Sequence, residues 1–318
     1  MKICMISGGQ LPIPSKGWGG VEVLLTNYLK ELENQGHQVV IANTTSLDLV
    51  ESTINDWNPD FVHLHYDVYT EFMSKIKCKK KAITSHYPYI DYPHIADKEG
   101  YSWIYEKMNK QTDSYVFSLS GFNKRIFEER GLEPSRVHVW KYGIPHKDFR
   151  YSSSPEKPDR SICLGKIEPR KRQSFLQTVA ANIDFAGPLA DDRFWKDQDS
   201  YLGQWTREQV HDDLTDYANL ILLSDGESAP QVVYEALMAG CGLVVSKEAS
   251  ANLNVDLPFI DVVDNSISRS KLLDVVEKNR EISIQHREEI RKYGIDNFSI
   301  EACVTNYVSL IESLGNLS

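Results

Sequence analysis

Two glutamates lie where a predicted strand passes into a predicted helix. Residues 219–223 form a short apolar run that is typical of a buried strand, and Pro230 suits the first turn of the helix that follows. Glu235 lies about two helical turns beyond Glu227, so both carboxylates can face one site. Apolar residues 236–239 predict that Glu235 is partly buried and needs partners such as sugar hydroxyls. The alternative is a chance spacing on a surface helix.

A basic segment follows another predicted strand, residues 161–164, and leads into a predicted helix at 173–181. Cations at a helix N-terminus oppose the helix dipole, which makes sense if the segment binds anions. The alternative is a solvated basic turn. The residues concerned are Lys166, Arg170, Lys171 and Arg172.

Glycine-rich sequences lie near the N-terminus. Ser7-Gly8-Gly9 follows the first predicted strand, and Gly17-Trp18-Gly19-Gly20 precedes the first predicted helix. Glycine lets backbone N–H groups approach an anion, and a helix N-terminus adds a favourable dipole. Neither sequence is a Walker loop or a GxGxxG fingerprint, so a structural turn is an equal alternative.

Three histidines follow or lie within predicted strands. His63 and His65 alternate along the predicted strand 61–66, and we expect them to point to opposite faces. His65 is expected at the carboxyl end of that strand, and His86 at the end of the strand at 81–85. No HxxxH or HExxH spacing occurs, so no zinc site is expected.

The predicted elements alternate, with short apolar strands and amphipathic helices in turn. This order is typical of βαβ units with parallel sheets, whose ligands bind at the carboxyl ends of the strands. A polar segment at 151–160 contains two prolines and is predicted to be an interdomain linker. The pattern favours two α/β domains facing across a cleft, as in a two-substrate enzyme or a two-domain binding protein. The remaining predicted strands are 2–6, 38–43, 114–119, 137–140, 183–186, 242–246 and 258–263.

Charge and cysteine content exclude several classes of protein. Acidic and basic residues cancel within residues 1–150, so the net charge of −10 belongs to the remainder, and nucleic acid is not an expected partner. The basic cluster Lys75–Lys81 is either a solvated turn or a contact with an anionic membrane or acceptor. Five scattered cysteines without a CxxC spacing favour a reducing, cytoplasmic location. The first residues are expected to form a strand and not a signal peptide, and no apolar run is long enough to span a membrane.

The chain resembles a retaining, nucleotide-sugar-dependent glycosyltransferase of family four, with the two-domain GT-B architecture. The resemblance covers nearly the whole chain and implies an acceptor-side domain at 1–150, the linker at 151–160, a donor-binding domain at 161–298, and a helix at 299–318 that crosses back onto the first domain. It rests on Gly19-Gly20-Val21-Glu22, Pro59-Asp60-Phe61-Val62-His63-Leu64-His65, Thr84-Ser85-His86, Tyr142-Gly143-Ile144-Pro145, Gly165-Lys166 with Lys171, Glu227 with Glu235, and Phe298-Ser299-Ile300-Glu301.

The resemblance implies a role for each matching residue. Glu235 is expected to hold the ribose hydroxyls, and Lys166 and Lys171 to neutralise the diphosphate as it leaves. His86 is expected beside the anomeric centre, where it joins Glu227 and Lys171 as the catalytic candidates. Further donor-binding candidates are Gly19, Gly20, Ser228, Ala229, Pro230 and Gln231, and acceptor-side candidates are His65, Tyr87 and Tyr89. Three positions depart from the family pattern: Lys166 replaces an arginine, Pro230 often a glycine, and Tyr142 an asparagine.

The activity that the resemblance implies is metal-independent transfer of a hexosyl group from a UDP- or GDP-sugar to a carbohydrate, lipid-linked or other hydroxyl acceptor. Negative charge on the departing diphosphate would be stabilised by the basic pair in place of a metal. Alternatives are other GT-B chemistry, such as sugar-nucleotide epimerisation, hydrolysis or phosphorolysis, and a non-catalytic sugar- or nucleotide-binding protein.

Overall fold

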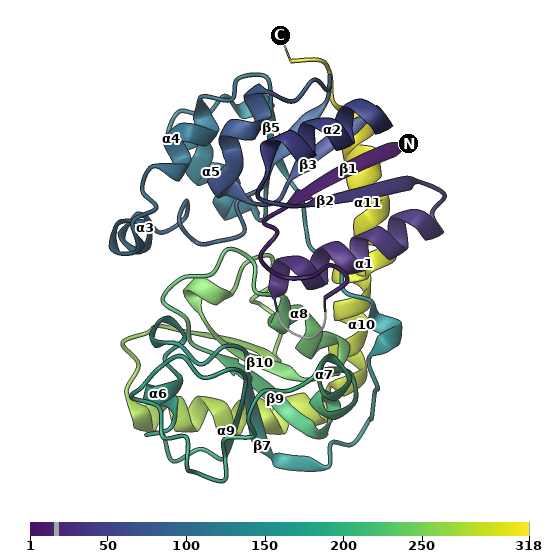
Figure 1. Cartoon of the computed structure of the whole chain (residues 1–318). Helices are drawn as coiled ribbons and strands as arrows, with labels where there is room; N and C mark the ends of the chain where they lie inside the picture. Colours follow the sequence, from purple (N-terminus) through teal and green to yellow (C-terminus); the bar gives the residue numbers. More distant parts are fainter. Residues whose placement is uncertain (16–18, 318) are drawn as a thin grey trace. The chain divides into compact units, whose positions relative to one another are not determined.

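The computed structural model describes residues 1–15 and 19–317, and the structural statements below refer to these. The chain divides into two compact units (Figure 1). Unit 1 joins Met1–Gly143 to Ile300–Ser318, and unit 2 is Ile144–Ser299. The first segment of unit 1 thus ends at Gly143, before residue 150, and the last helix of the chain belongs to this unit. No helix among the described residues combines the length and apolar character needed to cross a membrane.

Unit 1 contains a parallel sheet with the strand order β2-β1-β3-β4-β5-β6 in its described part. Short apolar runs form these strands because both faces of a parallel sheet are covered. The strands are β1 Lys2–Ser7, β2 Gln38–Asn43, β3 Phe61–Leu64, β4 Lys81–Ile83, β5 Tyr115–Ser118 and β6 Val137–Val139. The helices are α1 Gly20–Asn34, α2 Leu47–Trp57, α3 Pro93–Glu99, α4 Ile104–Asn109, α5 Gly121–Glu129 and α11 Ile300–Ser313, with short 3-10 turns η1 Asp67–Ser74 and η2 Pro134–Arg136.

The two faces of this sheet differ in chemistry. One face packs in an apolar core that includes Ile6, Val62 and Val116. The other face carries histidines and aromatic rings, and it is covered by α1 and α11, which pack against each other (Figure 1). Tyr307 of α11 lies 5.7 Å from the ring of His63 and bonds to its Nδ1 at 2.9 Å. Tyr28 of α1 lies 5.7 Å from Tyr307, so aromatic contacts join both helices to the sheet.

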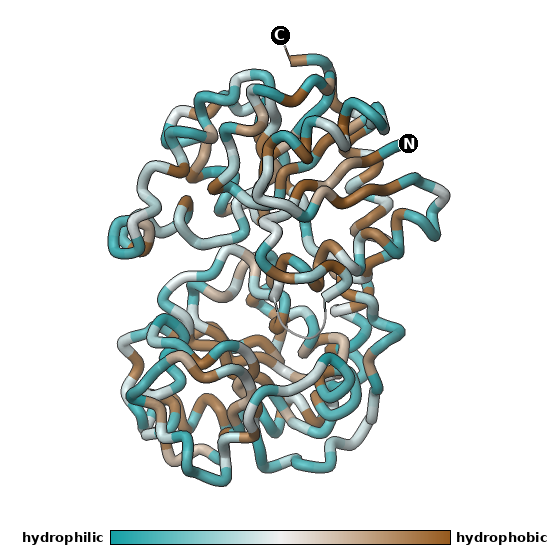
Figure 2. Tube along the Cα trace, viewed as in Figure 1, coloured by the Kyte–Doolittle hydropathy of each residue, from teal (hydrophilic) through white to brown (hydrophobic). Residues whose placement is uncertain are grey.

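Unit 2 contains a second parallel sheet, with the strand order β11-β10-β9-β7-β8 in its described part. Hydrophobic segments follow the strands of each unit and polar ones the surrounding loops (Figure 2). The strands are β7 Lys157–Leu164, β8 Ile183–Ala186, β9 Tyr217–Leu222, β10 Gly242–Ser246 and β11 Ile260–Val263. The helices are α6 Gln173–Leu176, α7 Arg207–Asp213, α8 Gln231–Met238, α9 Arg269–Gln285 and α10 Arg287–Phe298, with 3-10 turns η3 His146–Asp148, η4 Pro169–Lys171, η5 Leu214–Asp216 and η6 Lys247–Ala249.

Two predicted boundaries differ from the structure. The predicted linker 151–160 overlaps β7, which begins at Lys157, and the register of β7 against β9 shifts between Lys157 and Ser161. Such an irregularity accommodates Pro158, which has no N–H to donate to a ladder. The predicted helix 173–181 ends as α6 at Leu176, because the amides of Thr178 and Val179 bond to carbonyls three residues back.

The buried side chain of Arg287 fastens the start of α10 to the β9 side of unit 2. Its guanidinium donates to the carbonyl of Thr215 at 2.6 Å, of Tyr217 at 2.9 Å and of Ala239 at 3.1 Å, and also to that of Ser152 at 2.7 Å. These acceptors lie on segments that are far apart in the chain. One buried cation therefore joins four backbone carbonyls in different parts of unit 2.

We predict that Arg287→Met lowers the free energy of unfolding of unit 2 by at least about 3 kcal/mol, because hydrogen bonds to a charged group contribute about 1.5–3 kcal/mol each. Urea unfolding measures the change. Arg269→Met, at the exposed start of α9, is the matched control and should stay within about 0.5 kcal/mol of the parent. Equal stabilities of the two variants would contradict this role for Arg287.

Candidate active site

The topology of unit 2 brings two predicted site segments together. The chain proceeds from β7 to β8 on one side, and then to β9, β10 and β11 on the other side of β7. The topological switch point therefore lies between β7 and β9, and ligands of open α/β sheets bind at the carboxyl ends of strands at such a point. The amide of Asp225, after β9, donates to the carbonyl of Arg170, after β7, at 2.9 Å.

Glu227 lies in the loop between β9 and α8. It is ion-paired with two residues of the segment that follows β7. Its Oε1 is 2.9 Å from Nη1 of Arg170 and 3.9 Å from Nζ of Lys171. Arg170 also contacts Glu168 at 2.7 Å and donates to the carbonyl of Gly226. Burial alone would lower the pKa of Arg170, but the carboxylates of Glu227 and Glu168 raise it above its ordinary value. The sequence indicated Arg170 only as a member of the basic segment, and not as a partner of Glu227.

The two predicted phosphate lysines differ in environment. Lys171 is mostly buried and lies over Gly165, where a Cβ would be 3.2 Å from its Nζ. The backbone of Gly165 also has a φ of 133°, so a side chain there would be strained as well as crowded. Lys166 is half exposed, and its Nζ lies 3.7 Å from Glu168. The cations beside Glu227 are therefore Arg170 and Lys171, and Lys166 stands further out.

The N-terminus of α8 completes this cluster. Ser228 and Ala229 are buried, and Pro230 is the residue before the helix, which begins at Gln231. The Oγ of Ser228 has no hydrogen-bond partner among residues 1–15 and 19–317, although its exposure to solvent is negligible. A helix N-terminus favours anions. This end of α8 follows shortly after Glu227, whose Oε1 lies 3.9 Å from Nζ of Lys171.

Glu235 lies on α8 and has a partner that the sequence did not reveal. Its Oε1 accepts from Nη2 of Arg207, the first residue of α7, at 2.7 Å, and its side chain is 6% exposed. Arg207 also contacts Nε2 of His211 at 3.2 Å. Thr206 is the N-cap of α7 and forms a capping box, in which its hydroxyl accepts from the amide of Gln209. That motif predicts a helix start, but nothing in it predicts the pairing with α8.

In unit 1, the three histidines form one connected group on the polar face of the sheet. Nδ1 of His65 lies 3.2 Å from Nε2 of His86, and Nδ1 of His86 lies 2.5 Å from the hydroxyl of Tyr142. The rings of His63 and His65 are only 3.8 Å apart. The expectation that these two point to opposite faces was wrong, because residues i and i+2 of a strand share a face. Burial lowers the pKa of His86 to about 3, so its imidazole is neutral.

The two acceptor-side tyrosines have different surroundings. Tyr87 is 46% exposed, and the partial burial of its side chain raises the pKa of its hydroxyl to about 12. Tyr89 is buried, stacks on Tyr101 at 4.6 Å, and donates to Oε2 of Glu99 at 3.0 Å. Tyr87 can therefore meet a ligand as it stands, whereas Tyr89 is part of the packing beneath.

The predicted glycine loop before α1 is described in part. Gly17 and Trp18 lie outside the described residues. Gly19 precedes α1 with a φ of 107°, and a Cβ there would meet Oε2 of Glu22 at 2.6 Å. Gly20 is exposed and begins the helix.

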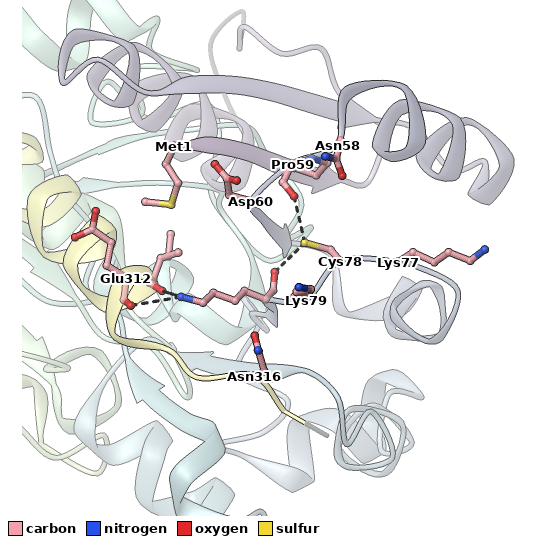
Figure 3. A pocket seen from close by; sticks show the side chains of 11 residues that line it. Met1, Asn58, Pro59, Asp60, Lys77, Cys78, Lys79, Glu312 and Asn316 are labelled. Atoms are coloured by element: carbon pink, nitrogen blue, oxygen red, sulfur yellow. Dashed lines mark hydrogen bonds between the residues drawn. The ribbon is translucent and has the colours of Figure 1, made fainter.

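A cavity of about 690 Å³ opens at the opposite, amino-terminal edge of the sheet in unit 1 (Figure 3). Met1 and Asp60 line it beside Lys77, Lys79 and Glu312, so charges of both signs face it. It includes none of the predicted catalytic or donor-binding residues. Of the basic cluster Lys75–Lys81, Lys77, Lys79 and Lys80 line the cavity, whereas Lys75 and Lys81 do not.

Lys80 and Lys81 are held within unit 1. Nζ of Lys80 donates to the carbonyls of Ile311 and Glu312 near the end of α11, at 3.2 and 3.4 Å. Lys81 is buried and lies 2.7 Å from Asp113. Lys75, Lys77 and Lys79 are exposed.

No family model and no curated protein matches the sequence, but solved structures resemble the chain over its whole length. The sucrose-phosphate synthase from Thermosynechococcus elongatus is 12% identical, with 98% of each chain covered and a TM-score of 0.75. HepE of Anabaena, solved in complex with UDP-glucose, is 13% identical, with 99% of this chain and 100% of that chain covered and a TM-score of 0.72. AviGT4, a glycosyltransferase involved in avilamycin A biosynthesis, is 12% identical, with 98% and 97% covered and a TM-score of 0.68. These likenesses confirm the predicted fold, two α/β units with parallel sheets as in GT-B structures.

We predict that Arg170→Met lowers the free energy of unfolding of unit 2 by about 2–3 kcal/mol, because it leaves two largely buried carboxylates without their charged donor. Lys166→Met is the control: its exposed contact with Glu168 should contribute less than about 1 kcal/mol. Chemical unfolding of both variants checks this. A larger loss in the Lys166 variant would mean that Arg170 does not organise the loop.

Proposed function

We propose that the protein is a glycosyltransferase that moves a hexosyl group from a nucleotide-diphosphate sugar to an acceptor hydroxyl, with retention of anomeric configuration. One observation carries the proposal. At the switch point of unit 2, Glu227, Lys171 and the N-terminus of α8 lie beside each other. A second buried glutamate, Glu235, projects from the same helix. Phosphates and sugar hydroxyls are the groups that such a set recognises.

The nucleotide end of the donor is assigned to Glu235. Arg207 engages Oε1 of this carboxylate, so we propose that Oε2 accepts from the ribose hydroxyls. A carboxylate oxygen is a stronger acceptor of hydroxyl hydrogen bonds than an amide oxygen. Likeness to HepE, solved with UDP-glucose, supports a nucleotide sugar as the donor; UDP- or GDP-sugars are the first to test.

The diphosphate is assigned to Lys171, Lys166 and the backbone N–H groups at the start of α8. Negative charge grows on this leaving group as the glycosidic bond breaks, so fixed donors stabilise the transition state more than the ground state. We propose that these cations act without a metal ion. Arg170 holds Glu227 and so orients it toward the donor sugar, together with Ser228, Ala229 and Pro230.

The stereochemical outcome rests on the resemblance to retaining enzymes. None of the carboxylates described above is an unpaired nucleophile, since Glu227 and Glu235 are each held by an arginine. We therefore propose front-face attack by the acceptor hydroxyl through an oxocarbenium-like state. The competing activities keep the same donor site: hydrolysis, epimerisation or phosphorolysis would release or alter the sugar without an organic acceptor.

Two proposals concern the cell. The five cysteines are free and four of them are buried, which supports a reducing, cytoplasmic compartment. Lys75, Lys77 and Lys79 are exposed on one short segment, which supports peripheral contact with an anionic membrane. At about 1 kcal/mol for each lysine near such a surface, the contact is weak and reversible.

We predict that Lys171→Ala lowers kcat about 100- to 1000-fold with UDP- or GDP-sugar as donor, in buffer that contains EDTA. Binding of the free nucleoside should be unchanged, because the lost charge faces the phosphates. Lys166→Ala should lower kcat less, in keeping with its outer position. Steady-state kinetics and calorimetry measure both quantities.

The exposed Lys278 of α9 supplies the control, and Lys278→Ala should have the parent kcat. A folded Lys171→Ala protein that turns over at the parent rate would remove the phosphate role of this segment. Parent activity that is lost in EDTA and restored by magnesium or manganese would refute the metal-free proposal.

A further inference from the structure

Unit 1 has a topological switch point of its own. From β1 the chain proceeds to β2 on one side and then to β3 on the other side of β1. Ligands of open parallel sheets bind beside the carboxyl ends of strands at such a point. Ser7 ends β1, and His65 follows directly after β3. These two residues therefore stand on the two strands that flank the switch point.

The strand register puts both side chains on the same face. Ile6 pairs with Leu64, and the amide of His65 donates to the carbonyl of Ile6 at 2.9 Å, which continues the ladder by one residue. Paired residues of neighbouring parallel strands project in the same direction. Ser7 and His65 thus lie side by side on the polar face of the sheet.

Both side chains carry a buried polar atom for which residues 1–15 and 19–317 supply no partner. Ser7 and His65 are each 1% exposed. The Oγ of Ser7 and the Nε2 of His65 have no hydrogen-bond partner within the described residues. Leaving a buried polar atom unpaired is unfavourable, so native structures supply a partner from the protein, a ligand or a water. Two such atoms on neighbouring strands can share one partner.

His86 differs from His65 in this respect, because its ring has no nitrogen to spare. Its Nε2 contacts His65 and its Nδ1 contacts the hydroxyl of Tyr142. Of this linked pair of rings, the nitrogen that can meet a ligand is Nε2 of His65. The sequence predicted His86 beside the substrate. We instead expect His65, which is hydrogen-bonded to His86, to make that contact.

The surroundings of Ser7 and His65 favour an uncharged ligand group. The ring of His65 lies against His63 and 5.5 Å from Trp140. Burial lowers the pKa of His65 well below its ordinary value, so the ring is neutral, and Ser7 is neutral as well. A phosphate prefers charged donors. A hydroxyl, which both donates and accepts, suits a neutral imidazole beside a serine.

We infer that Ser7 Oγ and His65 Nε2 together bind one hydroxyl group of a sugar, either of the donor or of the acceptor in the proposed transfer, on which this inference rests. His86 and Tyr142 are positioning residues. Their hydrogen bonds fix the plane of the His65 ring and determine which of its nitrogens carries the proton.

Three variants separate ligand contact from structural support. Ser7→Ala removes an oxygen that has no partner within the described residues, so folding stability should be unchanged or raised. His65→Asn keeps a polar atom near the position of Nδ1, which faces His86, and loses Nε2. His65→Gln keeps a polar atom near the position of Nε2 and should restore part of the function that His65→Asn loses.

Calorimetry with UDP-glucose and UDP, and with GDP-mannose and GDP, tests the donor arm. If the hydroxyl belongs to the donor sugar, Ser7→Ala and His65→Asn lower the affinity for the nucleotide sugar about 10-fold and leave the affinity for the free nucleotide unchanged. If it belongs to the acceptor, both affinities are unchanged and transfer to methyl α-D-glucoside falls about 10-fold. Folded variants with parent affinity and parent transfer would overturn the inference and leave the pair to a bound water.

A second measurement keeps this test separate from the proposed function. In the ¹⁵N-histidine spectrum of the parent protein, the Nε2 resonance of His65 is assigned by its loss in His65→Asn. UDP-glucose, GDP-mannose or methyl α-D-glucoside should shift this resonance, and a resonance that all three leave fixed at saturation would contradict the inference. Failure of the parent protein to bind any nucleotide would reject the proposed function alone.

Discussion

All strands of each sheet run parallel, and this one constraint places the chemistry. Parallel strands end at a common edge, so the loops that follow them meet there however far apart they are in the chain. In unit 2 this edge gathers Lys171 after β7 and Glu227 after β9, and the loop after β9 leads directly into α8. In unit 1 it gathers Ser7, His65 and His86. The cavity of about 690 Å³ at the amino-terminal edge of that sheet contains none of these groups.

Paired charges hold the edge of unit 2 in place. Glu227 and Glu235 are largely buried, and burial of a lone carboxylate is strongly unfavourable. Each carboxylate is paired with an arginine from another element. Arg170, in the segment after β7, pairs with Glu227, and Arg207, in α7, pairs with Glu235. Each arginine engages Oε1 of its glutamate. The carboxylates are therefore fixed in position before a ligand arrives, which lowers the entropy lost on binding.

Unit 1 uses neutral groups for a comparable purpose. One face of its sheet is apolar, whereas the other carries His63, His65, His86, Trp140 and Tyr142 under α1 and α11. Such a network is favourable only where its members find partners. Tyr307 and Thr84 satisfy the two nitrogens of His63. Ser7 Oγ and His65 Nε2, which have no partner among the described residues, lie at the carboxyl edge of the sheet.

Local patterns in the sequence predicted the strands and the candidate segments, since short apolar runs and the spacing of Glu227 and Glu235 depend on neighbours in the chain. Partners from distant elements were not predictable. Arg207 and Glu235 belong to different helices, and no periodicity relates them. Pro158 suggested a linker. In the structure it lies within β7, where the register against β9 shifts between Lys157 and Ser161. Both ring nitrogens of His86 have partners because one of them contacts Tyr142, whereas His65 keeps Nε2 for a ligand. Only the packed structure shows these contacts.

Hydrogen–deuterium exchange of the whole chain, with and without saturating UDP, GDP or ADP, tests most directly whether the switch point of unit 2 binds a nucleoside diphosphate. The account predicts that at least one nucleotide slows exchange in residues 165–173 and 224–235, while the segments that line the amino-terminal cavity, residues 58–60 and 77–80, exchange at their original rates. Protection at the cavity without protection at residues 224–235, or no protection by any of the three nucleotides, would contradict it.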